Sequence, residues 1–396
     1  MTELGIALRY LRGRLVASVL AVVSVALGIG LVVASVLLAR GVKEAFLEGA
    51  TDYSLVIGAK GSATQLVMNV VFRIDAALPN ILTSTYEGLR EDRRVEVAVP
   101  VAMGDAYQGF RYVATTPAYF AAFPWRHKRF GVAAGRLFHD DPTDRPSYEA
   151  VLGAAAARRT GLRLGDRFYE GEEMAGYPLT VVGILHPTRS ADDRAIFLSL
   201  PSYWGMNEIA RAMTIKPLTA VLVRPRQMSD LPALHRQLNV AAETQAVFPS
   251  AVLLAVFNLL DLTEDVLAVI LALVTVVVVL YLVVAMYGAT WERRREIATM
   301  RALGARRGTV LRIVLLECAA ITIVGGAVGL VGGHAIAYVG AQVLATRAGL
   351  VADPLALGVL QPVVLGVAVI VGTLAGLLPA MMAYRMEVAD NLAPLS

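Results

Sequence analysis

The hydrophobic pattern divides this chain into four long apolar runs and one long segment of mixed polarity. The apolar runs cover residues 15–38, 263–290, 310–340 and 357–383, and residues 39–262 hold most of the Asp, Glu, Pro and His. A helix rises about 1.5 Å per residue, so each run is long enough to cross a hydrocarbon core of about 30 Å. The pattern therefore predicts four transmembrane α-helices, with a large domain inserted between helices 1 and 2.

The N-terminal residues 1–14 are predicted to form a cytoplasmic amphipathic segment. Arg9, Arg12 and Arg14 alternate with apolar residues, which is typical of a helix lying along a membrane surface. The apolar run that follows contains no ionisable residue over 24 positions. The core of a cleaved signal peptide is usually about 7–15 residues long, so we expect an uncleaved membrane anchor.

The inserted segment, residues 39–262, predicts an extracytoplasmic α+β domain with stalks at its two ends. Apolar runs typical of strands are interrupted by a helix-forming stretch at residues 154–159, which we expect Gly161 to end. Strands and helices follow one another in a mixed order rather than in strict alternation, which favours an α+β class. The expected strands cover residues 95–101, 110–114, 179–185, 196–200 and 219–223.

A short basic segment, residues 291–309, separates the second apolar run from the third. Its arginines outnumber its acidic residues, so this loop is expected on the cytoplasmic side. It also has a helical pattern, with Ile297, Met300 and Leu303 at spacings of three and Gly304 where a helix would stop. We interpret it as a small helix that docks a soluble partner through these three apolar side chains.

Glycines recur at spacings of four in the last two apolar runs. Gly325, Gly329 and Gly333 follow this spacing in the third run, and Gly372 and Gly376 do so in the fourth. Small residues at this spacing allow two helices to approach closely in a lipid environment. We therefore expect these glycines to pack helices together within the membrane.

Composition agrees with a membrane protein. Charged residues make up 17% of the chain and hydrophobic residues 57%, whereas soluble domains carry roughly 25% charged residues. The net charge of +4 owes much to arginines flanking the apolar runs, so it indicates topology rather than nucleic-acid binding. The single cysteine, Cys318, excludes an intrachain disulfide.

The loop between the last two apolar runs, residues 341–356, is short and nearly uncharged, as expected outside the cell membrane. The C-terminal tail, residues 384–396, then returns to the cytoplasm. Both termini are thus expected to be cytoplasmic.

Few residues suggest catalysis. The run at residues 58–62 lacks the spacing of a phosphate loop, and these 396 residues contain no such motif. His139, Asp140, Asp141 and Asp144 suggest a metal site, but a solvated loop around Pro142 is the favoured interpretation. Asp192 and Asp193 are adjacent, and neighbours on a strand point to opposite faces, which argues against a catalytic pair.

Glu317 and His334 are the two ionisable side chains within the cores of the apolar runs. Glu317 fits a structural role, pairing with an arginine such as Arg312 or reaching the interface, and it also fits a role in coupling. His334 is expected to face neighbouring helices or lipid headgroups. Two such residues do not make an ion pathway.

The charged segment and its surroundings resemble the signature of FtsX/MacB-type permeases of ATP-binding cassette (ABC) systems. The resemblance begins at residues 296–305, Glu-Ile-Ala-Thr-Met-Arg-Ala-Leu-Gly-Ala, and continues with Leu-Leu-Glu at 315–317. Ala298 stands where the family usually has Gly. Further similar positions are residues 115–120, 135–136, 151–153, 156, 161–162, 165–166, 181–185, 192–193, 196–199, 379–380 and 388–390.

This resemblance implies a permease of the bacterial inner membrane that is not itself an enzyme. ATP and magnesium would be bound by a separate cytoplasmic ABC ATPase subunit, present in two copies, beside a second permease copy or paralogue. A periplasmic adaptor or lipoprotein is a further expected partner. The residues implied in ATPase coupling are Glu292, Arg293, Glu296, Ile297, Met300, Arg301, Leu303 and Gly304, with Glu317 as an additional candidate.

Two functional classes remain open. One is a transport permease that exports or extracts an amphiphile such as a lipoprotein, peptide, lipid or drug. The other is an FtsX-like mechanotransmitter that regulates an external partner such as a cell-wall hydrolase, without transport. FtsX-like regulators usually have a smaller external domain than the one expected here, which favours transport.

Overall fold

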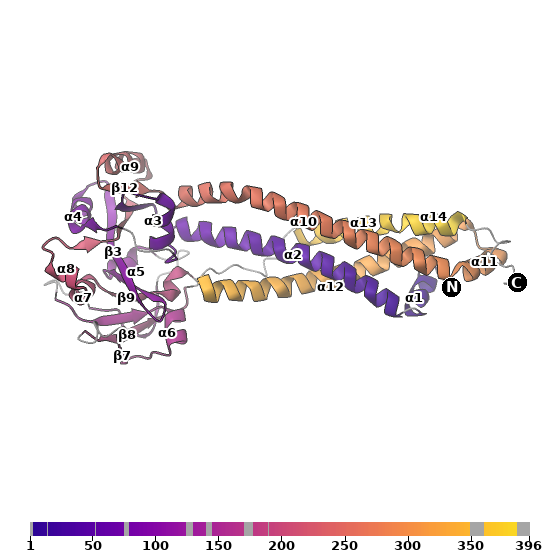
Figure 1. Cartoon of the computed structure of the whole chain (residues 1–396), viewed down its shortest axis with the longest axis horizontal. Coiled ribbons are helices and arrows are strands. Elements are labelled where there is room, and N and C mark those ends of the chain that lie inside the picture. Colours follow the sequence, from indigo (N-terminus) through magenta and orange to yellow (C-terminus); the bar gives the residue numbers. More distant parts are fainter. Residues whose placement is uncertain are drawn as a thin grey trace. The chain divides into compact units, whose positions relative to one another are not determined.

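The structure of the chain is a computed structural model (Figure 1). The structure describes residues 3–13, 15–51, 53–74, 79–123, 130–139, 145–169, 177–188, 190–348 and 360–385. The chain divides into two compact units, one formed by residues 1–40, 261–341 and 353–396, and the other by residues 41–260 and 342–352. We call the first the membrane unit and the second the outer domain.

The membrane unit is built from long apolar helices. Four of its helices are long and apolar enough to cross a membrane, covering Leu15–Thr51, Asp265–Glu292, Arg307–Leu344 and Pro362–Met382 within the described residues. Three of them are longer than a span requires: α2 continues to Thr51, α10 begins at Pro249, and α12 runs from Arg307 to Ala348. The helices are α1 (Glu3–Gly13), α2 (Leu15–Thr51), α10 (Pro249–Glu292), α11 (Arg294–Ala302), α12 (Arg307–Ala348), α13 (Leu360–Ala375) and α14 (Leu377–Arg385).

The fourth apolar run is interrupted rather than continuous. α13 ends at Ala375 and α14 begins at Leu377, with Gly376 between them. Pro379 explains the interruption, since proline has no N–H to donate and its ring clashes with the carbonyl four residues earlier, here that of Ala375. The sequence predicted one helix over residues 357–383, of which residues 357–359 lie outside the described part.

The outer domain is an α+β fold around one long sheet (Figure 1). The strand order is β12-β1-β11-β3-β4-β9-β6-β8-β5, β7 pairs with β8, and β10 pairs with β2 in a small second sheet. The strands are β1 (Leu55–Ala59), β2 (Ile81–Leu82), β3 (Val95–Tyr107), β4 (Phe110–Thr115), β5 (Val132–Gly135), β6 (Glu149–Leu152), β7 (Arg167–Phe168), β8 (Leu179–Leu185), β9 (Ile196–Ser199), β10 (Pro217–Leu218), β11 (Ala220–Pro225) and β12 (Thr244–Val247).

Short helices surround the sheet. α3 packs beside β1 and β12, α6 beside β8 and η2, and α9 beside β12. They are α3 (Ala63–Val70), α4 (Thr83–Glu91), α5 (Ala118–Ala122), α6 (Ala154–Thr160), η2 (Ala191–Arg194), α7 (Leu200–Met206), α8 (Glu208–Ala212), η3 (Met228–Asp230) and α9 (Leu231–Val240).

The long strand β3 divides the sheet into two halves. Residues 95–101 of β3 pair with β11, whereas residues 102–107 pair with β4, and the register shifts between Met103 and Ala106. We call β12, β1, β11 and the first part of β3 the β1 half, and the remaining strands the β9 half. Each face of the sheet is covered by buried apolar side chains.

Several local predictions for this domain are confirmed and others are wrong. The five expected strands and the helix over residues 154–159 are present, and Gly161 ends α6 in a left-handed conformation, φ 74°. Asp192 and Asp193 do not lie on a strand but on the 3₁₀ turn η2, and both are buried. Asp140, Asp141 and Asp144 lie outside the described residues, so the solvated loop remains a prediction there.

Candidate functional site

The short helix α11 meets α10 at a single non-helical residue. α10 ends at Glu292, α11 begins at Arg294, and Arg293 between them has φ −91° and ψ 9°. The chain thus changes from a long apolar helix to a short polar one across one residue. This arrangement makes Arg293 the joint between α10 and α11.

The side chain of Arg293 is held by Glu317 of α12. Arg293 donates two parallel hydrogen bonds to the Glu317 carboxylate, of 2.7 and 2.8 Å, and a third from Nε to the Ala289 carbonyl. Glu317 is 1% exposed. A bidentate pair of this kind fixes orientation as well as distance, so α12 holds the residue at which α11 begins.

This pairing corrects the expected neighbour of Glu317. The sequence suggested Arg312, five residues earlier, but the Nε of Arg312 donates to the Gly308 carbonyl at 3.3 Å. Residues five apart on a helix do not share a face. Arg293 lies 24 residues before Glu317 and makes two hydrogen bonds with its carboxylate. No pattern in the sequence indicated that these two residues would meet.

The far end of α11 is closed by backbone hydrogen bonds around Gly304. Ala305 N–H donates to the Met300 carbonyl and Gly304 N–H to that of Arg301, both at 3.0 Å. Gly304 has φ 99°, the left-handed conformation that this Schellman motif requires. The predicted helix end at Gly304 is thereby confirmed.

The three apolar side chains expected on one docking face have different environments. Ile297 is 6% exposed and joins the apolar cluster of the membrane unit, against which Met300 packs half-buried. Leu303, in contrast, is 85% exposed. The docking role of all three remains a prediction, but only Leu303 is freely accessible to a partner in this structure.

Most charged residues of the segment 291–309 lie at the protein surface. Glu292 and Glu296 are exposed and Arg301 is half-buried. Arg294 lies over the Trp291 ring, 4.9 Å from its centroid. Their predicted part in ATPase coupling is left open by this geometry.

The glycines of α12 lie directly against α2. A Cβ added at Gly329 would come within 2.7 Å of the Ala26 carbonyl oxygen, and one at Gly333 within 2.8 Å of the Gly30 carbonyl oxygen. A Cβ at Gly325 would lie 2.8 Å from Val25. The two backbones are therefore closer than any side chain would allow.

The glycines of the fourth run face α12 instead. A Cβ at Gly372 would overlap with Thr322, and one at Gly376 would overlap with Cys318. α12 is thus the central helix of this unit, with α2 along one part of its surface and α13 along another.

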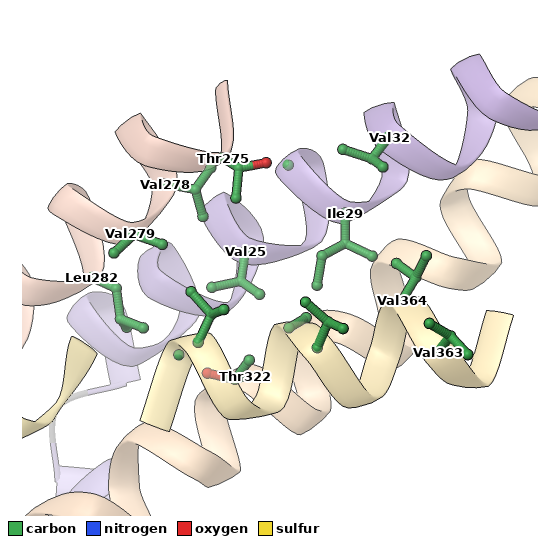
Figure 2. A pocket seen from close by; sticks show the side chains of 15 residues that line it. Val25, Ile29, Val32, Thr275, Val278, Val279, Leu282, Thr322, Val363 and Val364 are labelled. Carbon is green, nitrogen blue, oxygen red and sulfur yellow. The ribbon is translucent and has the colours of Figure 1, made fainter. Parts of the chain in front are cut away.

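An apolar cavity of about 260 Å³ lies among the helices of the membrane unit (Figure 2). Its two hydroxyl side chains, Thr275 and Thr322, each donate to the carbonyl four residues earlier, Leu271 and Cys318, at 2.8 Å. No charged side chain is among its lining residues. These are Val25, Gly28, Ile29, Val32, Thr275, Val278, Val279, Leu282, Thr322, Val363, Val364, Val367, Ala368, Val371 and Gly372.

Two family models match this chain. Residues 18–241 match the MacB-like periplasmic core domain, and residues 268–388 match the FtsX-like permease C-terminal domain. The chain belongs to the FtsX/MacB-type ABC transporter permease family. The second match contains the whole of α11 with Arg293 and Glu317, so the joint lies in the permease segment of this family.

Curated relatives agree with this family. The chain is 25% identical over 98% of its length to the macrolide export ATP-binding/permease protein MacB of Azoarcus sp. (strain BH72), covering 58% of that protein. It is 37% identical over 26% of its length, and 15% of the relative's, to the protein of the same name from Nitrobacter winogradskyi. The chain therefore spans less than two thirds of the length of these relatives.

Among solved structures, the periplasmic region of MacB from Actinobacillus actinomycetemcomitans is similar to part of this chain. The match has 10% identity and a TM-score of 0.37, and it covers 52% of this chain and 95% of that one.

Members of this permease family generally work with a cytoplasmic ABC ATPase.

Proposed function

We propose that this chain is the membrane subunit of an ATP-driven system that exports or extracts an amphiphile, such as a lipoprotein, peptide, lipid or drug. The chain itself is not catalytic: two copies of a separate ATPase subunit bind ATP and magnesium and act on two permease chains. The assembly lies in the bacterial inner membrane with both termini cytoplasmic. A periplasmic adaptor or lipoprotein is a further proposed partner.

The main support for this proposal is the way α11 is held at one end and exposed at the other. One end of this helix is anchored through Arg293 to Glu317, while Leu303 at the other end is 85% exposed. A partner that binds the exposed end and moves it would turn α11 about Arg293. Because Arg293 is bonded to α12 in two places, that motion would be passed to α12 as well as to α10.

From α12 the motion would reach α2 through the contacts of Gly325, Gly329 and Gly333. α2 is one continuous helix from Leu15 to Thr51, and α10 is continuous from Pro249 to Glu292. Both helices therefore extend beyond their spans as stalks, which we propose transmit the motion to the outer domain. The described residues that line the apolar cavity include no charged side chain, so this cavity offers no ion pathway.

We favour an amphiphile as the substrate because the cavity offers apolar contacts for the apolar part of such a molecule. The two hydroxyl groups of the cavity, those of Thr275 and Thr322, are already hydrogen-bonded to backbone carbonyls. ATPase activity of the reconstituted transporter should then respond to amphiphiles added alone. A response that needs an external protein and no amphiphile would instead identify a mechanotransmitter.

Leu303→Glu tests the docking step. A carboxylate at an exposed helix end should leave the fold intact but disrupt an apolar contact with the ATPase, so the ATPase should no longer co-purify in mild detergent. Met300→Glu should also abolish association, but Met300 packs against the membrane cluster, so its effect on folding must be measured separately.

Val240→Glu is the matched control for Leu303→Glu, since Val240 is 80% exposed in the outer domain. It should retain the ATPase at the wild-type ratio. Undiminished co-purification of the ATPase with Leu303→Glu would show that α11 does not dock through this end.

A further inference from the structure

Four polar side chains meet in the interior of the outer domain. The Tyr119 hydroxyl donates to Asp192 Oδ1 at 2.8 Å and shares a 2.8 Å hydrogen bond with the Tyr53 hydroxyl. Arg73 Nη2 donates to the same two groups, Tyr119 Oη at 3.2 Å and Asp192 Oδ1 at 3.3 Å. All four residues are buried, and we call them the buried cluster.

The buried cluster joins the two halves of the sheet. Tyr53 precedes β1, and Arg73 follows α3, which packs on β1 and β12, so both belong to the β1 half. Tyr119 is on α5, after β4, and Asp192 is on η2, before β9, so both belong to the β9 half. Each hydrogen bond from Tyr53 or Arg73 to Tyr119 or Asp192 therefore crosses from one half to the other.

The cluster also lies where the long strand changes partners. Arg73 Nη1 is 3.5 Å from the sulfur of Met103. Met103 is the last residue of β3 in register with β4 before that register shifts. The side-chain contacts thus hold the sheet at a position where the register of its backbone ladder shifts.

Stability alone does not account for a buried charge pair here. Removing both charges from water costs about as much as their attraction returns, and apolar replacements often stabilise a protein equally well. Arg73 adds further costs, because its buried Nε has no hydrogen-bond partner among the residues that the structure describes, and its backbone has φ 60°, uncommon outside glycine. Burial also raises the pKa of Asp192, although Arg73 opposes that shift. These costs are consistent with a cluster that fixes a geometry.

The end of α2 lies beside this cluster in the sequence and packs against Phe72, the neighbour of one of its members. α2 ends at Thr51, and Tyr53 is two residues further on. Within α2, the Phe46 ring packs on Phe72, the neighbour of Arg73, at 4.8 Å between ring centroids. Ala45 and Ala50 of the same helix are buried in the domain core. A displacement of this end of α2 would therefore act on both Tyr53 and Arg73.

We propose that the buried cluster is the joint through which the end of α2 sets the angle between the β1 half and the β9 half. Tyr119 and Asp192 are its positioning residues on the β9 half, and Tyr53 and Arg73 those on the side of α2. The use of this joint in transmission rests on the proposed function, whereas its role in holding the two halves does not.

The first test measures the distance between the halves in the full chain, without any ATPase. Spin labels are placed at Lys60→Cys in the β1 half and Arg158→Cys in the β9 half, two exposed positions, in a Cys318→Ala background. Tyr119→Phe removes only the bridging hydroxyl, and Asp192→Asn removes only the charge. Both substitutions should broaden and shift the distance distribution measured by double electron–electron resonance.

Ser202→Ala provides the control. The Ser202 hydroxyl is also buried and makes three hydrogen bonds, with Ser147 N–H, Tyr148 N–H and the Ser199 hydroxyl, but all of them lie within the β9 half. It should lower the thermal unfolding midpoint and leave the distance distribution unchanged. A wild-type distribution in both Tyr119→Phe and Asp192→Asn, or equal broadening in Ser202→Ala, would overturn the proposal.

The second test uses the transporter reconstituted with its ATPase. Addition of ATP should shift the same distance in the wild-type chain, and Tyr119→Phe should lose this shift while ATP hydrolysis continues. A shift of wild-type size in Tyr119→Phe would overturn the role of the cluster in transmission. A wild-type chain that shows no shift would contradict the proposed function, and the ATP-independent distributions would still decide whether the cluster joins the halves.

Discussion

At the scale of single residues, the pair between Arg293 and Glu317 should be sensitive to substitution. Glu317 is 1% exposed, so its charge depends on Arg293 for compensation. Breaking a buried pair by removing one partner typically costs about 3–5 kcal/mol, whereas replacing both partners by apolar residues is often neutral. Replacing one partner should therefore destabilise the chain, whereas replacing both should cost much less.

We predict that Glu317→Met and Arg293→Met each destabilise the chain by about 3 kcal/mol, and that the double variant is more stable than either single one. Thermal unfolding in detergent would measure all three against Glu296→Gln, which changes an exposed carboxylate and should behave as wild type. Strictly additive effects of the two substitutions would show that the residues do not act as a pair.

At the scale of elements, the contact between α2 and α12 depends on the absence of side chains. A Cβ at Gly329 would lie 2.7 Å from a backbone oxygen of α2, which cannot move aside as a flexible side chain can. Three residues along the same helix, a Cβ at Gly332 would meet no atom within 4 Å. Gly332 is therefore a matched control for substitutions at Gly329.

Gly329→Ala is accordingly expected to destabilise the membrane unit by about 1–3 kcal/mol through overpacking. Gly332→Ala should be neutral or slightly stabilising, because alanine favours a helix more than glycine does. Unfolding midpoints of the two variants in the same detergent would compare them. If Gly329→Ala is as stable as Gly332→Ala, the close approach of α2 and α12 is incorrect.

Elements with a local cause could be predicted from the sequence, and contacts between distant residues could not. Gly304 and Gly161 end their helices as expected because the left-handed conformation is a property of the residue itself. The exposure of Leu303 beside the burial of Ile297 depends instead on which residues of α10 and α12 lie nearby. Likewise, Arg73 and Asp192 are 119 positions apart, so no local pattern could pair them.

At the scale of the whole molecule, the proposed topology rests on charges beside the candidate membrane spans. The arginines of residues 291–309 predict a cytoplasmic position for this segment, and four spans would then place both termini on that same side. Lys60 in the outer domain and Thr299 on α11 are both exposed and are expected on opposite sides of the membrane.

This topology predicts opposite labelling of two single-cysteine variants in a Cys318→Ala background. Lys60→Cys should react with a membrane-impermeant maleimide in intact cells. Thr299→Cys should react only after the inner membrane is opened. Labelling of both positions in intact cells, or of neither until lysis, would contradict the proposed orientation.

The glycine contacts between α2 and α12 also bear on how the protein is made. Gly30 and Gly329 touch in the folded chain but are separated by about 300 residues of sequence. At a synthesis rate of about 5–20 residues per second, α2 leaves the ribosome on the order of 15–60 s before its partner helix. Throughout that interval the surface of α2 that will receive α12 contacts lipid or the insertion machinery, so assembly of the membrane unit has to wait until α12 has been synthesised.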